Sequence, residues 1–496
     1  MRILGLLVGL AIGIRAAIWF ALPNVADADE SLQYLEQAGR IVFGRAMVPW
    51  EYQIGARSWI VPALIAPVMG LFSALSGQPA FYLNALHAVM VVLSASIVVS
   101  SYHIGRQTSP SAGLWAAGLN AIWAETIYFA PHFLPDNWAA ILLIGAMALA
   151  AAPLPERRAR WLLAGIVFGF AFIVRLQLGF AIATAIFGVC GLRFRQRLLP
   201  VSLGFSLPLA LLGLSDWITW GAPFYSAYAY IVSNLSGIAA AFGTEPLWYF
   251  FRFEAMQWAL AAPILVITMI VGGRQQRLPL VVAGVIVATF SAVAHKESRF
   301  IYPAIPLLLT VAGIGTARLL GLPPGAIPAW INRLLPGGAR RAPVMVGLAG
   351  AVWFGLSLQV GLRPDMRSLF QRDADVLSAF RAINADPGAC GVGVERRKWS
   401  SYAYVFLRKE IGLFQMTPET AARDQSAFNF ILANRFAGAR DVYPRLGYAQ
   451  VYCSHADAVC LFKRPGSCDL SHSVPLKPDS GPGVTIPLAR LGFTVE

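Results

Sequence analysis

The chain has 496 residues, of which 57% are hydrophobic and 13% are charged, about half the charged share of an average soluble domain. This composition excludes a soluble globular protein, and repeated apolar runs of roughly 20 residues predict an α-helical polytopic membrane protein. The formal net charge of +14 does not indicate nucleic-acid binding, because the basic residues fall in short loops and form no recognition helix.

The first apolar run, 1–22, carries one early arginine and predicts a span whose N-terminus lies in the cytoplasm. A signal peptide is the alternative, but the run is long for the apolar core of one. The run at 161–191 has basic loops on both sides, so it is expected as one span or as two short halves broken near Arg175. Further spans are predicted at 59–75 (or an interfacial segment), 81–101, 113–130, 137–152, 198–214, 248–272, 278–294, 301–320 and 343–362.

Residues 23–57 form the longest polar insertion in the N-terminal half and contain five carboxylates: Asp27, Asp29, Glu30, Glu36 and Glu51. The loops near 157–160, 193–197, 274–277 and 333–341 are basic instead. Because basic loops stay in the cytoplasm, 23–57 is predicted to be a loop on the outer side. Apolar spacing predicts a helix from Ser31 that lies flat in the membrane interface, with Asp29 as its N-cap.

Two more polar segments fall on that same side by counting spans. One is the aromatic-rich segment 216–247, expected as a loop, and the other is the hexapeptide His295-Lys296-Glu297-Ser298-Arg299-Phe300. Charge at bilayer depth costs several kcal/mol. The hexapeptide is therefore either a turn whose charges reach the headgroups, or a cationic cluster that binds an anionic lipid headgroup.

The chain divides into two predicted domains, a multi-span domain at 1–362 and a small soluble α/β domain at 363–496. Four of the five cysteines lie in the second domain: Cys390, Cys453, Cys460 and Cys468. Their placement predicts disulfide bonds on an oxidising side of the membrane, with unpaired thiols as the alternative and the pairing open. Their spacing does not match a structural zinc site.

An outer face with carboxylates in one loop and a Lys/Arg/His cluster in another suits group transfer from a lipid phosphate. A carboxylate can take the proton of an acceptor hydroxyl, and cations can stabilise the charge on the leaving phosphate. The sequence contains no P-loop, GxSxG or HExxH motif, which argues against nucleotide hydrolysis, serine-type acyl transfer and zinc proteolysis.

Three blocks, in order along the chain, resemble glycosyltransferase family 22, whose eukaryotic members are ER mannosyltransferases that build N-glycan precursors and GPI anchors. The hexapeptide resembles the family signature HKE-x-RF. The first loop is similar at Asp29, Glu30, Gln33, Glu36, Ala38, Gly44, Trp50, Glu51, Arg57, Ser58 and Pro62, and the third block at Asp216, Trp220, Gly221, Asn234 and 242–249. Ala28, Gly39 and Pro49 replace the proline, histidine and threonine of the family pattern.

The resemblance implies a GT-C glycosyltransferase fold and an inverting mannosyltransferase that uses a polyprenyl-phosphate sugar donor and a glycan or glycolipid acceptor. Asp29 would be the general base, with Glu30 positioning it. The donor phosphate would bind His295, Lys296 and Arg299, with Glu297 orienting a cation. Arg175 would be a further phosphate ligand or a structural charge. Trp50, Glu51 and Arg57 would shape the acceptor groove or anchor the loop, and His132 and Asp136 would be site residues or ordinary loop residues.

No cofactor is expected to be required, because fixed cations can balance a monophosphate leaving group. Asp27 with Asp29 and Glu30 could recruit a divalent cation. Two alternatives stay open, a GT-C transferase of another lipid-linked sugar and a flippase or transporter of lipid-linked saccharides. Only five of the 39 basic residues are lysine, which favours a bacterial inner-membrane protein with its site facing the periplasm over an ER protein.

Overall fold

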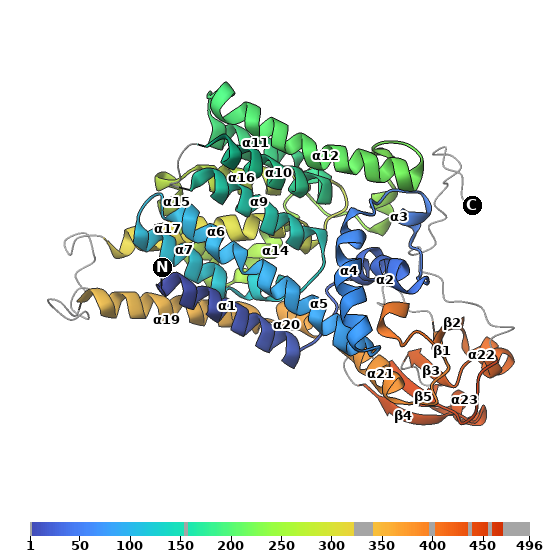
Figure 1. The fold of residues 1–496 in the computed structure, drawn as a ribbon. Coiled ribbons are helices and arrows are strands. Elements are labelled where there is room, and N and C mark those ends of the chain that lie inside the picture. Colours follow the sequence, from blue (N-terminus) through green and yellow to red (C-terminus); the bar gives the residue numbers. More distant parts are fainter. Residues whose placement is uncertain are drawn as a thin grey trace.

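The computed structural model describes residues 2–152, 157–321, 341–395, 402–434, 439–454 and 459–469. Figure 1 shows a large bundle of helices with a small mixed α/β domain at one end. The helices of the bundle are α1 (Arg2–Ala21), α4 (Ile60–Leu75), α5 (Pro79–Ser94), α6 (Ser96–Gly105), α7 (Pro110–Ile122), α8 (Ala124–Phe129), α9 (Pro135–Ala151), α10 (Arg158–Val174), α11 (Gly179–Cys190), α12 (Leu199–Trp220), α13 (Tyr225–Leu235), α14 (Tyr249–Trp258), α15 (Ala261–Gln275), α16 (Leu278–Ser291), α17 (Ile305–Leu320) and α19 (Arg341–Gly361).

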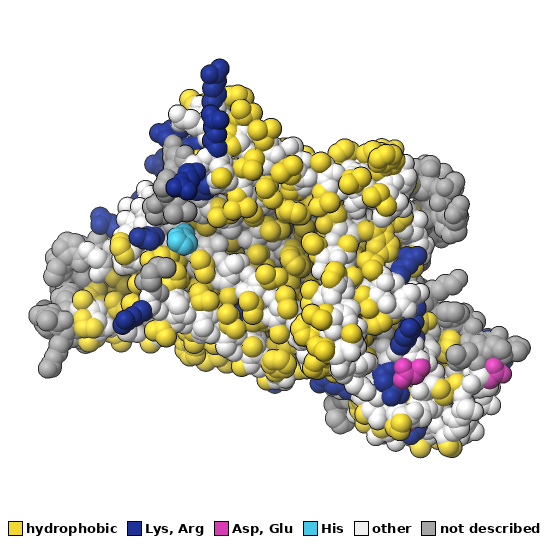
Figure 2. Space-filling model, in the orientation of Figure 1, with side chains coloured by type: hydrophobic (Ala, Val, Ile, Leu, Met, Phe, Trp, Pro, Cys, Tyr) yellow, Lys and Arg dark blue, Asp and Glu magenta, His cyan; other side chains and the backbone are white. Residues whose placement is uncertain are grey.

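The bundle confirms the prediction of a polytopic helical membrane protein. Within the described residues, five helical stretches are long and apolar enough to cross a membrane, or six if the pair α14 and α15, bent by 112°, counts as one span. On the face that Figure 2 shows, apolar side chains cover much of the bundle, and basic side chains lie at its end away from the α/β domain and again beside that domain. An apolar surface of this kind is stable against lipid and not against water.

A predicted span contains a break, and a predicted loop is partly helical. The run at 161–191 divides at Arg175, where α10 ends and a short 3-10 turn, Leu176–Leu178, leads into α11. The segment 216–247 was predicted as a loop, and this prediction is wrong for its first half. There α12 continues to Trp220 and α13 follows. The buried Asp216 carboxylate of α12 joins the two helices by accepting hydrogen bonds from the Ser226 backbone N–H and hydroxyl at 2.8 and 2.6 Å.

Glycines allow the helices to pack closely, as is common where lipid provides no hydrophobic drive between helices. A Cβ atom on Gly272 of α15 would lie 2.0 Å from the carbonyl oxygen of Val311 in α17. A Cβ atom on Gly315 of α17 would lie 1.9 Å from the carbonyl oxygen of Thr268. This pair of helices therefore cannot accept larger side chains at either position.

The α/β domain contains one five-stranded sheet with the order β2-β1-β3-β5-β4. β1 is parallel to β2 and β3, whereas β5 is antiparallel to β3 and β4. Its elements are α20 (Pro364–Phe370), α21 (Ala374–Ala385), β1 (Gly391–Glu395), β2 (Gly412–Met416), α22 (Pro418–Asp424), β3 (Phe430–Asn434), α23 (Ala439–Arg445), β4 (Ala449–Cys453) and β5 (Val459–Lys463).

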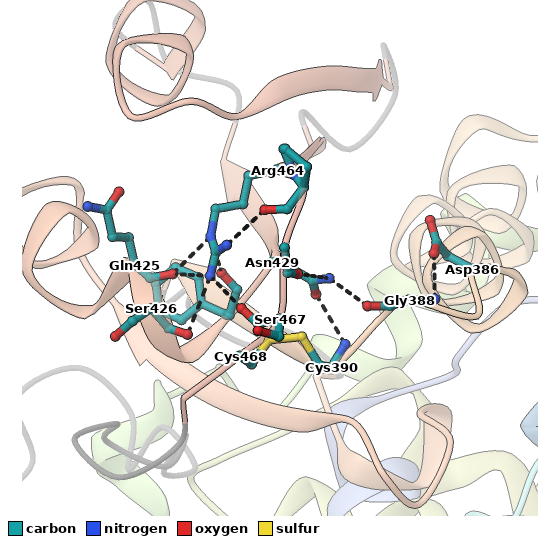
Figure 3. The surroundings of a disulfide bond; sticks show 12 residues. Asp386, Gly388, Cys390, Gln425, Ser426, Asn429, Arg464, Ser467 and Cys468 are labelled. Carbon is teal, nitrogen blue, oxygen red and sulfur yellow. Dashed lines mark hydrogen bonds between the residues drawn. A yellow bond between two sulfur atoms is a disulfide. The ribbon is translucent and has the colours of Figure 1, made fainter.

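Two disulfide bonds close this domain, Cys390–Cys468 and Cys453–Cys460, which confirms the expectation of disulfides and supplies their pairing. The second bond joins residues directly opposite each other on β4 and β5. Figure 3 shows the first bond beside Asn429, whose side chain accepts from the Cys390 N–H at 3.1 Å and donates to the Gly388 carbonyl at 2.7 Å. The cross-link therefore ties the C-terminal end of the described chain to the start of β1.

The α/β domain and the segment 23–57 share one apolar core, which includes Leu35, Met47, Val405 and Phe406. The helix α2 (Glu36–Phe43) lies between the bundle and the domain (Figure 1). The buried Glu36 carboxylate accepts the backbone N–H groups of Tyr404 and Val405 at 3.0 and 2.8 Å, and that of Met47 at 2.8 Å. The domain is thus held directly on the predicted first loop.

Candidate active site

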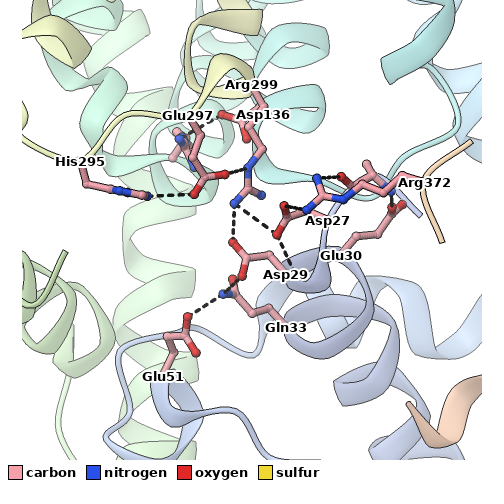
Figure 4. Close-up of polar contacts among 12 residues, drawn as sticks. Asp27, Asp29, Glu30, Gln33, Glu51, Asp136, His295, Glu297, Arg299 and Arg372 are labelled. Carbon is pink, nitrogen blue, oxygen red and sulfur yellow. Dashed lines mark hydrogen bonds and ion pairs between the residues drawn. The ribbon is translucent and has the colours of Figure 1, made fainter. Parts of the chain in front are cut away.

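The first loop and the hexapeptide meet although they are far apart in sequence. Arg299 Nη2 lies 2.7 Å from Asp29 Oδ2, across a separation of 270 positions, and 3.5 Å from Asp27 Oδ1. Arg299 Nε donates to Glu297 Oε2 at 2.6 Å. Figure 4 shows these three carboxylates around one guanidinium. The Nη1 nitrogen of Arg299 makes no hydrogen bond to a described residue, so part of the guanidinium remains available to a ligand.

Asp29 does not cap a helix, so the N-cap prediction is wrong. Its backbone is already helical, and a π-helix, Glu30–Leu35, follows it. The carboxylate is instead bound on both sides, because Oδ1 accepts from Gln33 Nε2 at 2.8 Å and Oδ2 accepts from Arg299. Gln33 also donates to Glu51 Oε1 at 2.6 Å. A row of polar contacts therefore runs from Glu51 through Asp29 to the hexapeptide (Figure 4).

These residues line a cavity of about 1190 Å³. At its polar end lie Asp27, Asp29, His295, Lys296, Glu297 and Arg299. Its remaining wall is largely apolar and comes from α10, α12, α13 and α16, with Phe172, Leu209, Leu212, Ile231, Leu235 and Phe290. The volume exceeds that of a typical pocket for a drug-sized ligand, roughly 300–1,000 Å³, so the cavity can hold a sugar phosphate together with part of a lipid chain.

The other two cations of the hexapeptide also line the cavity. Lys296 is buried and donates to the carbonyls of Glu245 and Val293 at 2.7 and 2.5 Å, which orient its ammonium group without neutralising it. His295 Nδ1 donates to the Gly243 carbonyl at 3.0 Å, and its Nε2 lies 3.0 Å from Glu297 Oε1. Since a carbonyl and a carboxylate both accept, His295 satisfies both partners only as the imidazolium.

The pKa shifts follow from these contacts. The hydrogen bond to Glu297 raises the pKa of His295, although burial opposes it. Burial would raise the pKa of Glu297, but the charge of Arg299 and the His295 contact hold it well below its usual range. Burial raises the pKa of Asp27 to about 6. Burial and the nearby Asp29 charge raise the pKa of Glu51 to about 7.

Arg175 lies on the cavity wall at the break between α10 and α11, and it is buried. Its Nη2 lies 3.0 Å from Asp136 Oδ1, and its guanidinium packs over the rings of Phe290 and Phe300. The sequence-based expectation left its role open between a phosphate ligand and a structural charge. The structure gives it a carboxylate partner and also places it at the cavity.

Trp50, Glu51 and Arg57 all line the cavity. The guanidinium of Arg57 lies over the ring of Tyr230 in α13, 5.3 Å from its centroid. Its backbone carbonyl accepts from Trp220 Nε1 at 3.2 Å. Arg57 therefore joins the first loop to α12 and α13 while its side chain lies at the cavity.

Glu30 does not line this cavity. It is 1% exposed and points toward the protein interior, where His132 Nδ1 lies 3.0 Å from its Oε2. Its two oxygens also accept the backbone N–H groups of Ala26 and Phe133 at 3.0 and 2.7 Å. Burial opposes ionisation, but the charge and hydrogen bond of His132 lower the pKa of Glu30 to about 2. The structure therefore separates Glu30 from Asp29.

Glu30, His132 and His87 together could hold a metal ion, since one ligand atom of each lies within 4.8 Å of the others. Two histidines and a carboxylate are a ligand set suited to zinc. However, both oxygens of Glu30 already accept a backbone N–H and lie 3.0 and 3.2 Å from His132 Nδ1. Three donors therefore already lie against the carboxylate, and we assign no metal ion to this cluster. The expected trio of Asp27, Asp29 and Glu30 does not converge on one point.

Sequence reasoning left Asp136 open between a site residue and an ordinary loop residue, and it missed Arg372. Asp136, at the start of α9, pairs with Arg175, and Arg372, between α20 and α21, pairs with Asp27 at 3.2 Å. Asp136 had a weak signal, because it lies on the same predicted side as the first loop. Arg372 had none, because nothing near it in the sequence differs from an ordinary surface arginine.

Comparisons with known proteins give the family and the fold. Residues 6–374 match the Alg9-like mannosyltransferase family. GPI mannosyltransferase 3 of Yarrowia lipolytica is 26% identical over 306 residues, which cover 59% of this chain and 59% of the relative. Alpha-1,2-mannosyltransferase alg9 of Schizosaccharomyces pombe is 24% identical over 342 residues, covering 60% of this chain and 56% of that protein. The chain thus matches less than two thirds of the length of either relative.

Two solved structures share the fold. ArnT from Cupriavidus metallidurans bound to undecaprenyl phosphate superimposes with a TM-score of 0.58 at 12% identity, over 92% of this chain and 97% of that one. The oligosaccharyltransferase of Archaeoglobus fulgidus gives a TM-score of 0.51 at 12% identity, over 92% of this chain and 72% of that one. The GT-C fold expected from the sequence is confirmed.

Proposed function

The chain belongs to the Alg9-like mannosyltransferase family, and from this membership we propose that it transfers mannose from a polyprenyl-phosphate donor to a hydroxyl group of a glycan or glycolipid. The observation that carries the proposal is the 2.7 Å contact between Asp29 of the first loop and Arg299 of the hexapeptide at the polar end of one cavity. A proton acceptor and a phosphate-binding cation thus lie side by side.

In the proposed reaction, the acceptor hydroxyl approaches Asp29, whose side chain is 34% exposed. As its oxygen bonds to the anomeric carbon, the carboxylate takes the hydroxyl proton. The bond between the anomeric carbon and the phosphate oxygen breaks on the opposite face, and its electron pair leaves with the polyprenyl phosphate. The anomeric configuration is therefore inverted, and no covalent sugar–enzyme intermediate forms.

Cations at the cavity wall would bind the donor phosphate and stabilise it as it leaves. Lys296 keeps an uncompensated positive charge, since its described partners are carbonyls. Arg299 offers Nη1 while its other nitrogens hold the three carboxylates, and His295 adds a third cation. These are the residues proposed to bind the phosphate, with Arg175 of the cavity wall in a supporting role.

The apolar wall of the cavity supports a polyprenyl lipid as the carrier of the sugar. The fold likeness to ArnT, whose structure is described as bound to undecaprenyl phosphate, supports the same choice. Arg193 and Arg195, between α11 and α12, and Arg274, in the last turn of α15, are exposed. Figure 2 shows a group of basic side chains at the end of the bundle away from the disulfide-bonded domain. By the positive-inside rule this supports a cavity that faces the periplasm, or the lumen in a eukaryotic cell.

The proposal is tested with purified protein and synthetic polyprenyl phosphates that carry radiolabelled mannose, glucose, galactose or an aminopentose. A glycolipid extract from cells that lack the gene serves as the acceptor. We expect transfer from the mannose donor, with an inverted anomeric configuration in the product by NMR. Lys296→Met should raise the donor KM about tenfold, because one charge-assisted contact to phosphate is lost. Lys409→Met, an exposed lysine of the α/β domain, is the matched control.

Two outcomes would contradict the proposal. Preferential transfer of another sugar would assign the chain to a GT-C transferase of a different lipid-linked sugar. Movement of the labelled donor across a proteoliposome membrane without any transfer would indicate a flippase.

A further inference from the structure

Arg372 connects the α/β domain to the reacting end of the cavity. It lies in the turn between α20 and α21, where Asp373 has a left-handed backbone with φ of 53°. Arg372 Nη1 donates to the Ala26 carbonyl at 2.8 Å, and Arg372 Nη2 lies 3.2 Å from Asp27 Oδ2. The Arg372 carbonyl accepts the backbone N–H of Val25 at 3.1 Å. Three separate contacts therefore reach three consecutive residues just before Asp29.

Asp27 links Arg372 to the proposed base, Asp29. Its Oδ1 accepts the backbone N–H of Asp29 at 3.1 Å and lies 3.5 Å from Arg299 Nη2. One carboxylate thus holds Arg372 on one side, and the Asp29 backbone and Arg299 on the other (Figure 4). Because Arg299 is shared between Asp27 and Asp29, the charge on Asp27 determines how strongly Arg299 holds Asp29.

The domain that carries Arg372 is fixed on the same loop and on α5 by other contacts. Arg45 donates from its two Nη atoms to the carbonyls of Ile411 and Arg408 at 2.9 and 2.8 Å, and Tyr82 donates to the Val405 carbonyl at 2.8 Å. The position of Arg372 is therefore set by a folded domain rather than by a free side chain. The family match ends at residue 374, so most of this domain lies beyond it.

We propose that Arg372 is a positioning residue for sugar transfer, which acts through Asp27 to hold Asp29 against Arg299. The proposal rests on the function proposed above. Arg372 balances the Asp27 charge, so that Asp27 fixes the Asp29 backbone without drawing Arg299 away from Asp29. The α/β domain is then part of the catalytic unit, and its docking sets the geometry of the base.

The test is a double-mutant cycle of Arg372→Ala, Asp27→Asn and the combined variant, with Arg372→Lys added. Turnover and donor KM are measured with polyprenyl-phosphate mannose. We expect Arg372→Ala to lower kcat about tenfold with little change in KM, since a small misplacement of a catalytic group slows chemistry more than binding. The combined variant should be no more than about twofold slower than Asp27→Asn alone, and Arg372→Lys should recover most of the rate. Arg367→Ala, an exposed arginine of α20, is the control.

Additive losses in the combined variant, or an unchanged kcat in Arg372→Ala, would overturn the proposal. If Arg372→Ala does not fold, the other two variants still test the proposal. A positioning role requires that Asp27→Asn lowers kcat and that Arg372→Lys keeps most of the wild-type kcat. Melting temperatures of the same proteins without substrate form a second cycle. If the wild type transfers no sugar from any donor, the proposed function fails, and this thermal cycle still shows whether Arg372 acts through Asp27.

Discussion

Asp29 and Glu30 are neighbours in sequence, yet they belong to two different polar clusters. Asp29 lies at the large cavity, 34% exposed, against Arg299. Glu30 is 1% exposed, and its carboxylate contacts His132 and accepts hydrogen bonds from two backbone N–H groups. Successive residues of a helix point in directions roughly 100° apart, so one acidic pair at the start of a helix can serve two purposes. One carboxylate faces the ligand and the other fixes the helix that carries it.

The difference predicts separate consequences for activity and stability. A group at the cavity can lose its charge without leaving a buried partner unpaired, because solvent or ligand can replace it. A buried group cannot lose its charge in this way, because the groups that donate hydrogen bonds to it would then lose their only acceptor. Substituting each residue in turn should therefore separate chemistry from folding.

The largest effect is expected for Asp29→Asn. The amide keeps the size of the side chain but cannot take the acceptor proton, so turnover should fall about a thousandfold. The melting temperature should change by no more than a few degrees, since Gln33 and Arg299 remain near other carboxylates. Turnover with polyprenyl-phosphate mannose and a thermal melt in the same detergent measure both quantities. An active Asp29→Asn enzyme would remove Asp29 from the role of base.

Glu30→Ala should show the reverse pattern. Removing one partner of a buried ion pair leaves His132 and the N–H groups of Ala26 and Phe133 without an acceptor, which costs about 3–5 kcal/mol. We expect a strong decrease in melting temperature and in the yield of monodisperse protein. Glu30→Gln is the matched control and should recover part of the loss. Normal stability in Glu30→Ala would show that the cluster does not anchor the helix.

The sequence predicted most of the helices, because length and apolar content alone identify a membrane span. It also predicted that the hexapeptide and the first loop would lie on one side. It could not predict that Glu30 points inward, because Glu30–Leu35 is a π-helix, whose i→i+5 hydrogen bonds put more residues in each turn and change the angle between successive side chains. It could not find Arg372 either, since its contact with Asp27 depends on how a separate domain docks.

The docking of that domain should depend on pH through Glu36. Burial raises the pKa of Glu36 to about 7, although the N–H groups of Met47, Val405 and Tyr404 oppose the shift. The pKa of Glu36 is thus higher in the folded protein than in the unfolded chain, where it lies near 4. The stability that this group contributes is fully present below pH 4 and is lost as the pH rises through 7. Between pH 5.5 and 8.5 the wild type should lose roughly 2 kcal/mol from this group.

Glu36→Gln tests this prediction, because the amide is close in size and does not ionise. The difference in unfolding free energy between Glu36→Gln and the wild type should change by the same roughly 2 kcal/mol over that range, with the variant gaining relative stability at high pH. Glu410→Gln, an exposed residue of the same domain, should follow the wild type. Parallel curves for Glu36→Gln and the wild type would show that Glu36 keeps one protonation state throughout.

The smallest effect is expected for removal of divalent cations. At the cavity, Lys296 and the free Nη1 of Arg299 already provide fixed positive charge for a monophosphate leaving group. In the inner cluster, the N–H groups of Ala26 and Phe133 and the His132 ring already lie against the Glu30 carboxylate, so a metal ion would have to displace His132 from it. Excess chelator should therefore change turnover less than about twofold. A loss of activity that Mg²⁺ or Mn²⁺ restores would instead place a metal among the carboxylates Asp27, Asp29 and Glu297. Arg299 would then serve to hold that acidic cluster together rather than to bind the phosphate itself.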